Sequence, residues 1–151
     1  MVGGLVPGCV TLPAIAAVTE DAPVVSILDD KVDPPAIEPW VVDRVQPFAD
    51  FSVDTAVASH NVKGPLYYSW YYDFETVNDI PLPFYSLCGD SSRCLFSVCT
   101  RANATDKEHR LLLVVSDSKL NANPKDPVDF PEGAAFDTVQ WQLSLVGVCP
   151  E

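Results

Sequence analysis

Five cysteines and two histidines are the residues of this 151-residue chain whose chemistry depends most on their surroundings. No two cysteines have C-x-x-C spacing, and His60 and His109 are the only histidines, so no spacing supports a structural zinc site. Four cysteines lie in the C-terminal half, namely Cys88, Cys94, Cys99 and Cys149. We therefore predict disulfides, which form in oxidising compartments, and no metal.

These four cysteines allow three pairings. Cys88 and Cys94 bracket a short polar loop, which favours a local bridge, and Cys149 follows the last expected strand, where a bridge to Cys99 would hold the end of the domain. Among the three pairings we favour Cys88 with Cys94 and Cys99 with Cys149. Closing the longer loop is expected to stabilise the fold by about 3 to 4 kcal/mol.

The fifth cysteine, Cys9, stands apart near the start of the chain. The residues before it, Leu5-Val6-Pro7-Gly8, resemble a bacterial lipobox, which makes Cys9 a candidate for lipidation. The alternative is an unmodified thiol in a flexible tail. Contact with a membrane is expected only through such an anchor.

Catalytic chemistry has little support in the sequence. No Gly-x-Ser-x-Gly motif is present, and the two histidines fall in different settings. His60 lies in an expected turn, where solvent surrounds it. His109 begins an expected strand, where we predict that it partners a backbone carbonyl. We expect no enzyme activity.

Aspartates in or beside expected turns are the candidates for a calcium site: Asp29, Asp30, Asp33, Asp73 and Asp117. They match no loop of fixed ligand spacing such as the EF-hand. Asp is also common in turns for its own hydrogen bonding. We expect solvated turn acids, and no cofactor of any kind.

The charge and proline content limit both the partners and the fold. A formal net charge of -12, from 21 acidic and 9 basic residues, opposes binding to nucleic acid or anionic lipid. Fourteen prolines exclude long helices, and the apolar stretches between them are short and rich in residues that favour strands. The chain is predicted to be all-β, with a single β-sandwich over residues 34–151 after an irregular linker over residues 1–33.

Three segments carry the clearest strand patterns. Residues 66–74 alternate so that Trp70 faces the core, and residues 138–145 place Trp141 on an inner face with a polar outer face. Residues 109–117 are apolar on both faces, which is typical of a central strand whose outer side is partly covered. A long loop over residues 119–135 separates the last two strands.

Residues 66–73, Leu-Tyr-Tyr-Ser-Trp-Tyr-Tyr-Asp, resemble the strand-C signature of PKD-type and cadherin-like immunoglobulin folds of bacterial surface proteins. Residues 109–117 are similar to the penultimate strand of these folds. With the lipobox-like start and the cysteine pattern, residues 34–149 resemble bacterial immunoglobulin-like cell-envelope lipoproteins. The resemblance implies a single antiparallel immunoglobulin-like β-sandwich and a role in adhesion or scaffolding.

We therefore expect a non-enzymatic, extracytoplasmic domain, in the cell envelope or secreted, that binds an unidentified protein or glycan. The alternative is an accessory carbohydrate-binding β-sandwich of a secreted system. Tyr67 and Tyr71 lie on the strand face opposite Trp70 and form a possible contact surface for a sugar or a peptide. Cross-strand packing on the sheet surface is the other explanation for these tyrosines.

Overall fold

The computed structural model describes residues 21–73, 87–100, 106–122 and 124–151, and over these residues the chain is all-β, as predicted. A single 3-10 turn, η1 (Val98–Thr100), follows the sixth strand. The described strands are β1 (Val24–Ile27), β2 (Trp40–Asp43), β3 (Phe48–Ser52), β4 (Val57–His60), β5 (Tyr67–Tyr72), β6 (Arg93–Ser97), β7 (Glu108–Ser116) and β8 (Phe136–Val146).

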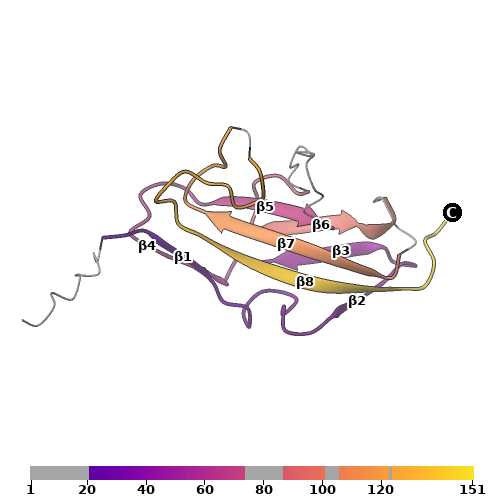
Figure 1. Cartoon of the computed structure of the whole chain (residues 1–151). Coiled ribbons are helices and arrows are strands. Elements are labelled where there is room, and N and C mark those ends of the chain that lie inside the picture. Colours follow the sequence, from indigo (N-terminus) through magenta and orange to yellow (C-terminus); the bar gives the residue numbers. More distant parts are fainter. Residues whose placement is uncertain (1–20, 74–86, 101–105, 123) are drawn as a thin grey trace, which may run out of the picture.

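The strands form a four-stranded sheet in the order β2-β8-β7-β5 and two pairs, β1-β4 and β3-β6. The β3-β6 pair lies across the core from the four-stranded sheet, an arrangement consistent with a β-sandwich (Figure 1). β7 is antiparallel to both neighbours, but β2 runs parallel to β8, so the expectation of a purely antiparallel fold is wrong. A pattern of only four residues, as in β2, does not indicate in which direction the strand runs relative to its neighbour. This explains the difference.

Two tryptophans and a phenylalanine form the centre of the core. Trp70 from β5 and Trp141 from β8 stack with ring centroids 5.7 Å apart, and Phe51 from β3 packs edge-on against Trp141 at 5.2 Å. All three side chains are fully buried, as the alternation of their strands predicts for the two tryptophans. Burial of such large side chains is the main source of stability in a domain of this size.

Both indole N–H groups are satisfied by loop carbonyls. Trp70 Nε1 donates to the carbonyl of Ser91 at 2.7 Å, and Trp141 Nε1 donates to the carbonyl of Pro34 at 2.6 Å. A buried donor without an acceptor would cost free energy, so these bonds fix the positions of two loops relative to the core.

The folded domain begins earlier than residue 33, where the sequence placed the end of the linker. Val25, Ile27 and Val32 are buried in the core, and the backbone N–H of Ile27 donates to Asp137 on β8 at 2.7 Å. β1 pairs with β4 in antiparallel register. A four-residue strand with two inward side chains gives too short a pattern to separate it from an acidic, proline-punctuated linker.

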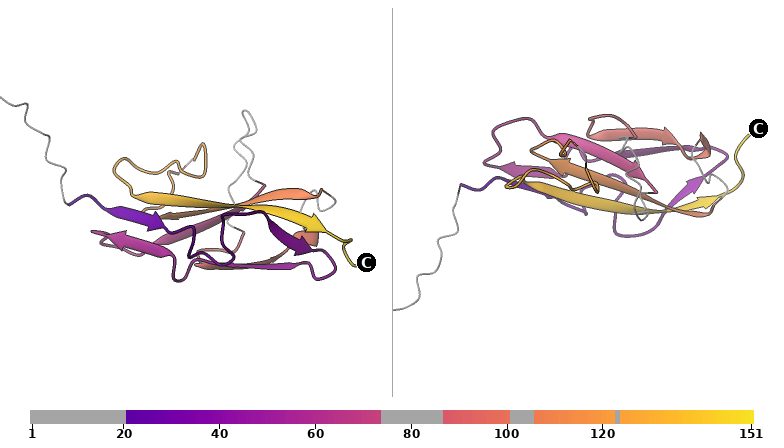
Figure 2. Two further views of the ribbon diagram at one scale, coloured as in Figure 1. Left: turned by 90° about the horizontal axis from the view of Figure 1, so that it is seen from below. Right: turned by 45° about the horizontal axis from the view of Figure 1, so that its top comes forward.

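The outer face of the four-stranded sheet is partly covered, as the apolar character of β7 predicts. Val114 is 1% exposed although it points away from the core, and the loop between β7 and β8 rises on that side of the sheet (Figure 2). Asp129 organises this loop. Its carboxylate accepts hydrogen bonds from the Lys125 backbone N–H at 2.9 Å and the Asn121 amide at 2.7 Å, and these bonds lower the pKa of Asp129.

Both expected disulfides are confirmed. Cys88 and Cys94 are joined with their Cα atoms 5.3 Å apart, and Cys99 and Cys149 with theirs 5.7 Å apart. Two bridges in one small domain indicate an oxidising environment. Cys9 lies outside the described residues.

Removing the disulfide that closes the longer loop should destabilise the protein more than removing the other, because the stabilisation grows with the logarithm of loop length. The Cys99–Cys149 bridge spans 50 residues and the Cys88–Cys94 bridge spans 6. Chain entropy then predicts a loss of about 4 kcal/mol for C99A/C149A and about 2 kcal/mol for C88A/C94A. Urea unfolding of both double variants measures the two losses, and a larger loss for C88A/C94A would contradict the loop-length explanation.

A candidate binding hollow beside an open sheet edge

The tyrosine surface expected on β5 is not an exposed platform. Tyr71 is 5% exposed, and its burial raises the pKa of its hydroxyl. Tyr67 is half-buried, and the ammonium of Lys119 lies 5.5 Å from the centre of its ring. Of the two explanations given for these tyrosines, the burial of Tyr71 favours packing on the sheet over a contact surface. The period of a strand gives the face on which a side chain lies and not what covers that face.

His109 is buried with both ring nitrogens engaged. Nδ1 lies 2.5 Å from a carboxylate oxygen of Asp73, and Nε2 lies 3.1 Å from the backbone carbonyl of Asp106. The ring also stacks on Tyr72 with centroids 5.1 Å apart. The carbonyl contact was predicted, whereas the Asp73 contact was not. Both ring nitrogens of this buried side chain therefore contact groups of the protein itself.

Asp73 joins the end of β5 to β7. One carboxylate oxygen contacts His109, and the other accepts a hydrogen bond from the backbone N–H of Arg110 at 3.0 Å. Asp73 itself has a φ of 49°, a left-handed conformation that Asp and Asn adopt more readily than most residues. The aspartate and histidine therefore hold a strand end in place.

The other aspartates considered for calcium lie apart. Asp117 accepts hydrogen bonds from the Ala135 backbone N–H and the Ser118 hydroxyl at the base of the β7–β8 loop, while Asp29 and Asp30 are exposed in a turn. Across the described ranges no three His, Cys, Asp or Glu side chains gather in a way that could hold a metal ion. His60 is exposed at the end of β4.

Asp33 lines a polar hollow of about 400 Å³ with Asp50, Ser52, Asp54 and Arg93. The Arg93 guanidinium donates to Asp50 through Nε at 2.9 Å and lowers the pKa of that carboxyl. The Ser92 hydroxyl donates to Asp54 and lowers its pKa as well. The positive charge of Arg93 therefore already lies among these carboxylates.

Exposed apolar side chains gather along β2 and beside it instead. They are Ile37, Trp40, Val41, Val45 and Val146. Val146 is opposite Asp43 where β8 pairs with β2. An apolar surface of this kind on a folded domain is typical of a contact site.

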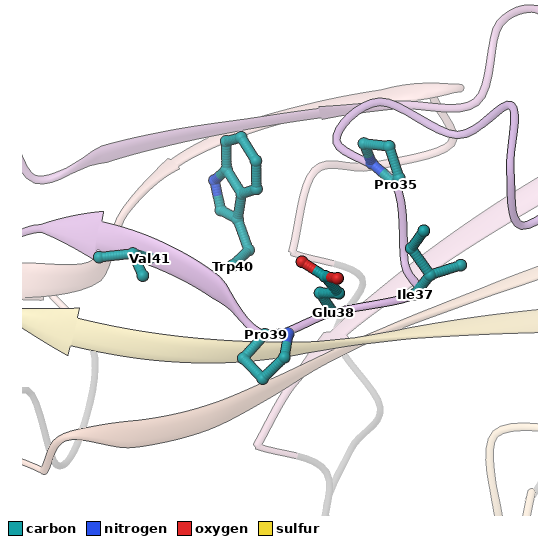
Figure 3. A pocket seen from close by; sticks show the side chains of 6 residues that line it. All are labelled: Pro35, Ile37, Glu38, Pro39, Trp40 and Val41. Carbon is teal, nitrogen blue, oxygen red and sulfur yellow. The ribbon is translucent and has the colours of Figure 1, made fainter.

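A hollow of about 460 Å³ lies in this surface, and we call it the β2 hollow (Figure 3). Five of its lining residues are apolar and one is a carboxylate: Pro35, Ile37, Glu38, Pro39, Trp40 and Val41. Figure 3 shows the carboxylate of Glu38 between the side chain of Trp40 on one side and those of Ile37 and Pro35 on the other.

The position of the hollow follows from the fold. β2 is the outer strand of its sheet, and no described strand pairs with its other side. Val42 points into the core, but Trp40, two residues earlier on the same strand face, reaches the rim and is 43% exposed. The Pro34 carbonyl held by Trp141 fixes the start of the lining segment.

Sequence reasoning did not find this hollow. The lining segment, residues 35–41, spans the prolines at which the sequence pattern changes from linker to strands. Trp40 and Val41 are exposed at this sheet edge, and Pro39 and Asp43 lie at the two ends of the short strand. Proline and charged residues are common on native edge strands, where they limit pairing with other chains. The feature of the sequence that could have indicated the hollow is the cluster of prolines with Ile37 and Trp40.

Comparison with protein families, with curated proteins and with solved structures finds no match for this chain. Within the described part of the chain no helix is long and apolar enough to cross a membrane. The functional proposal therefore rests on the geometry of the β2 hollow.

The Asp73 contacts generate a stability prediction. Asp73→Ala removes acceptors from His109 and the Arg110 backbone and places Ala at a positive φ, so we expect a loss of about 3 kcal/mol. Asp73→Asn keeps one acceptor oxygen and should lose about 1 to 2 kcal/mol.

Urea unfolding measures both values, with exposed Asp30→Ala as the matched control that should change stability by less than about 0.5 kcal/mol. Equal losses for the two Asp73 variants would show that the negative charge of the side chain, and not its acceptor geometry, holds the strand end.

Proposed function

We propose that this chain is a non-enzymatic, extracytoplasmic immunoglobulin-like domain that binds a protein partner at the β2 hollow. The observation that carries the proposal is the exposed apolar hollow at a sheet edge with which no described strand pairs. An open edge offers backbone N–H and C=O groups to an extended segment of another protein, and pockets beside it select side chains. The hollow supplies such a pocket next to the edge.

The strand order supports the immunoglobulin-like assignment. β5, β7 and β8 are antiparallel neighbours in one sheet, as strands C, F and G are in immunoglobulin sandwiches, and β3 pairs with β6 in the facing layer. Trp70 on β5 is buried at the centre of the core, at the place of the tryptophan on strand C.

The environment of His109 supports a role without catalysis. Its two nitrogens are held by Asp73 and the Asp106 carbonyl, and its side chain is 1% exposed. A general base needs a nitrogen within reach of a substrate proton. This histidine instead stabilises the end of β5.

Site-specific photocrosslinking in the native cells tests the binding proposal. A photoreactive p-benzoylphenylalanine in place of Val41, which lines the hollow at its β2 side, should give one discrete protein adduct. The same group in place of Gln140, which is exposed on β8, should give none. A second substitution, Ile37→Lys, places a charge in the lining and should abolish the adduct. Adducts from position 140 alone, from both positions equally or from neither would refute the proposal.

We further propose that the domain is held in the cell envelope through a lipid on Cys9. The lipobox-like Leu5-Val6-Pro7-Gly8-Cys9 motif and the oxidising environment indicated by the disulfides support this location. The protein isolated from its own cells should carry a diacylglycerol mass on Cys9, and Cys9→Ala should move it from the membrane fraction to the soluble fraction. A free Cys9 thiol in membrane-bound protein would contradict the anchor.

A further inference from the structure

The β2 hollow has a composition that selects one kind of side chain. Among the described residues that line it, the walls are apolar and the carboxylate of Glu38 is the only charge. Among the described residues no Lys, Arg or His forms an ion pair with Glu38, since the ion pairs found there join Arg93 with Asp50 and His109 with Asp73. The carboxylate is therefore available to a cation from outside.

The aromatic wall adds to this preference. Trp40 is 43% exposed and stands beside the carboxylate (Figure 3). Trp is the aromatic side chain that attracts a cation most strongly over its ring, and a neighbouring carboxylate strengthens the attraction. Ile37, Pro35 and Pro39 offer apolar contact to a hydrocarbon stem.

The charge of the whole chain favours the same ligand. A net charge of -12 attracts basic segments and repels acidic ones over the distance of the Debye length. It also opposes pairing of β2 with the β2 of a second copy, which would bring two Glu38 side chains and two strongly acidic chains together. A basic partner fits better than a homodimer.

Resting on the proposed function, we infer that the partner presents an extended segment with a lysine or arginine side chain that enters the β2 hollow. The hydrocarbon stem of this side chain lies across Pro35, Ile37 and Pro39, and its cationic head lies between the Trp40 ring and the Glu38 carboxylate. The backbone of the segment pairs with the open edge of β2. Glu38 and Trp40 thus determine specificity, while the strand edge provides sequence-independent affinity.

Titration of the full chain with capped peptides tests this inference. The probe is acetyl-Thr-Val-Thr-Lys-Val-Thr-amide, and its matched controls carry arginine, norleucine or glutamate in place of lysine. The binding constant is followed by the NMR shifts of the Trp40 indole and the Val41 amide. Lysine and arginine peptides should bind about fivefold to tenfold more tightly than the norleucine peptide, and the glutamate peptide more weakly still.

Variants of the protein test the role of the Glu38 charge separately from any effect on folding. Glu38→Gln should remove the preference for lysine over norleucine, whereas Glu132→Gln, which changes an exposed acid on the β7–β8 loop, should leave it intact. Trp40→Leu should weaken the binding of the lysine peptide several-fold. Equal affinity for the lysine and norleucine peptides, or no shift of Trp40 with any peptide, would overturn the inference.

The photocrosslinking experiment distinguishes this inference from the proposed function. Glu38→Gln in the chain that carries the photoreactive group at position 41 should reduce the adduct several-fold. An adduct that persists at full yield would mean that a partner binds the edge without a cation in the hollow, so the inference fails while the proposed function stands. Absence of the adduct from the unaltered hollow would instead refute the proposed function.

Discussion

The stacking of Trp70 on Trp141 is the interaction on which most of the molecule depends. These two side chains fill the centre of the core, and the N–H group of each must find an acceptor inside the protein. The acceptors are carbonyls of two loops, at Ser91 and at Pro34. Pro34 directly precedes the residues that line the β2 hollow, so the requirement of a buried indole positions a surface site.

The long strands were predictable from the sequence, whereas the four-residue strands β1 and β2 were not. β8 has eleven residues and alternates Trp141 and its inward neighbours with polar residues, which gives an unambiguous face. β7 is apolar on both faces, which indicated a covered outer side. β1 and β2 have four residues each, and their partners β4 and β8 lie far along the chain. Such pairings are decided by tertiary packing, which no local pattern records.

The same limit applies to the candidate site. Sequence periodicity placed Tyr71 on the outer face, but the cover over that face decides that it is buried. Trp40 is exposed because β2 lies at the edge of its sheet. Asp73 and His109 are 36 residues apart in sequence and meet only through strand pairing. Exposure and long-range pairing follow from the assembled layers. The favoured cysteine pairing, by contrast, came from a short polar loop between two cysteines and from the position of Cys149 after the last expected strand.

The Cys99–Cys149 bridge also changes how the domain would respond to mechanical force. Tension applied beyond Cys149 passes through the bridge to η1 and bypasses β7 and β8, both of which lie inside the closed loop. The 50-residue separation between the two cysteines would extend to roughly 180 Å if it were free, and the bridge withholds that length. A domain built in this way keeps its two central strands paired under load while the segments outside the loop stretch first.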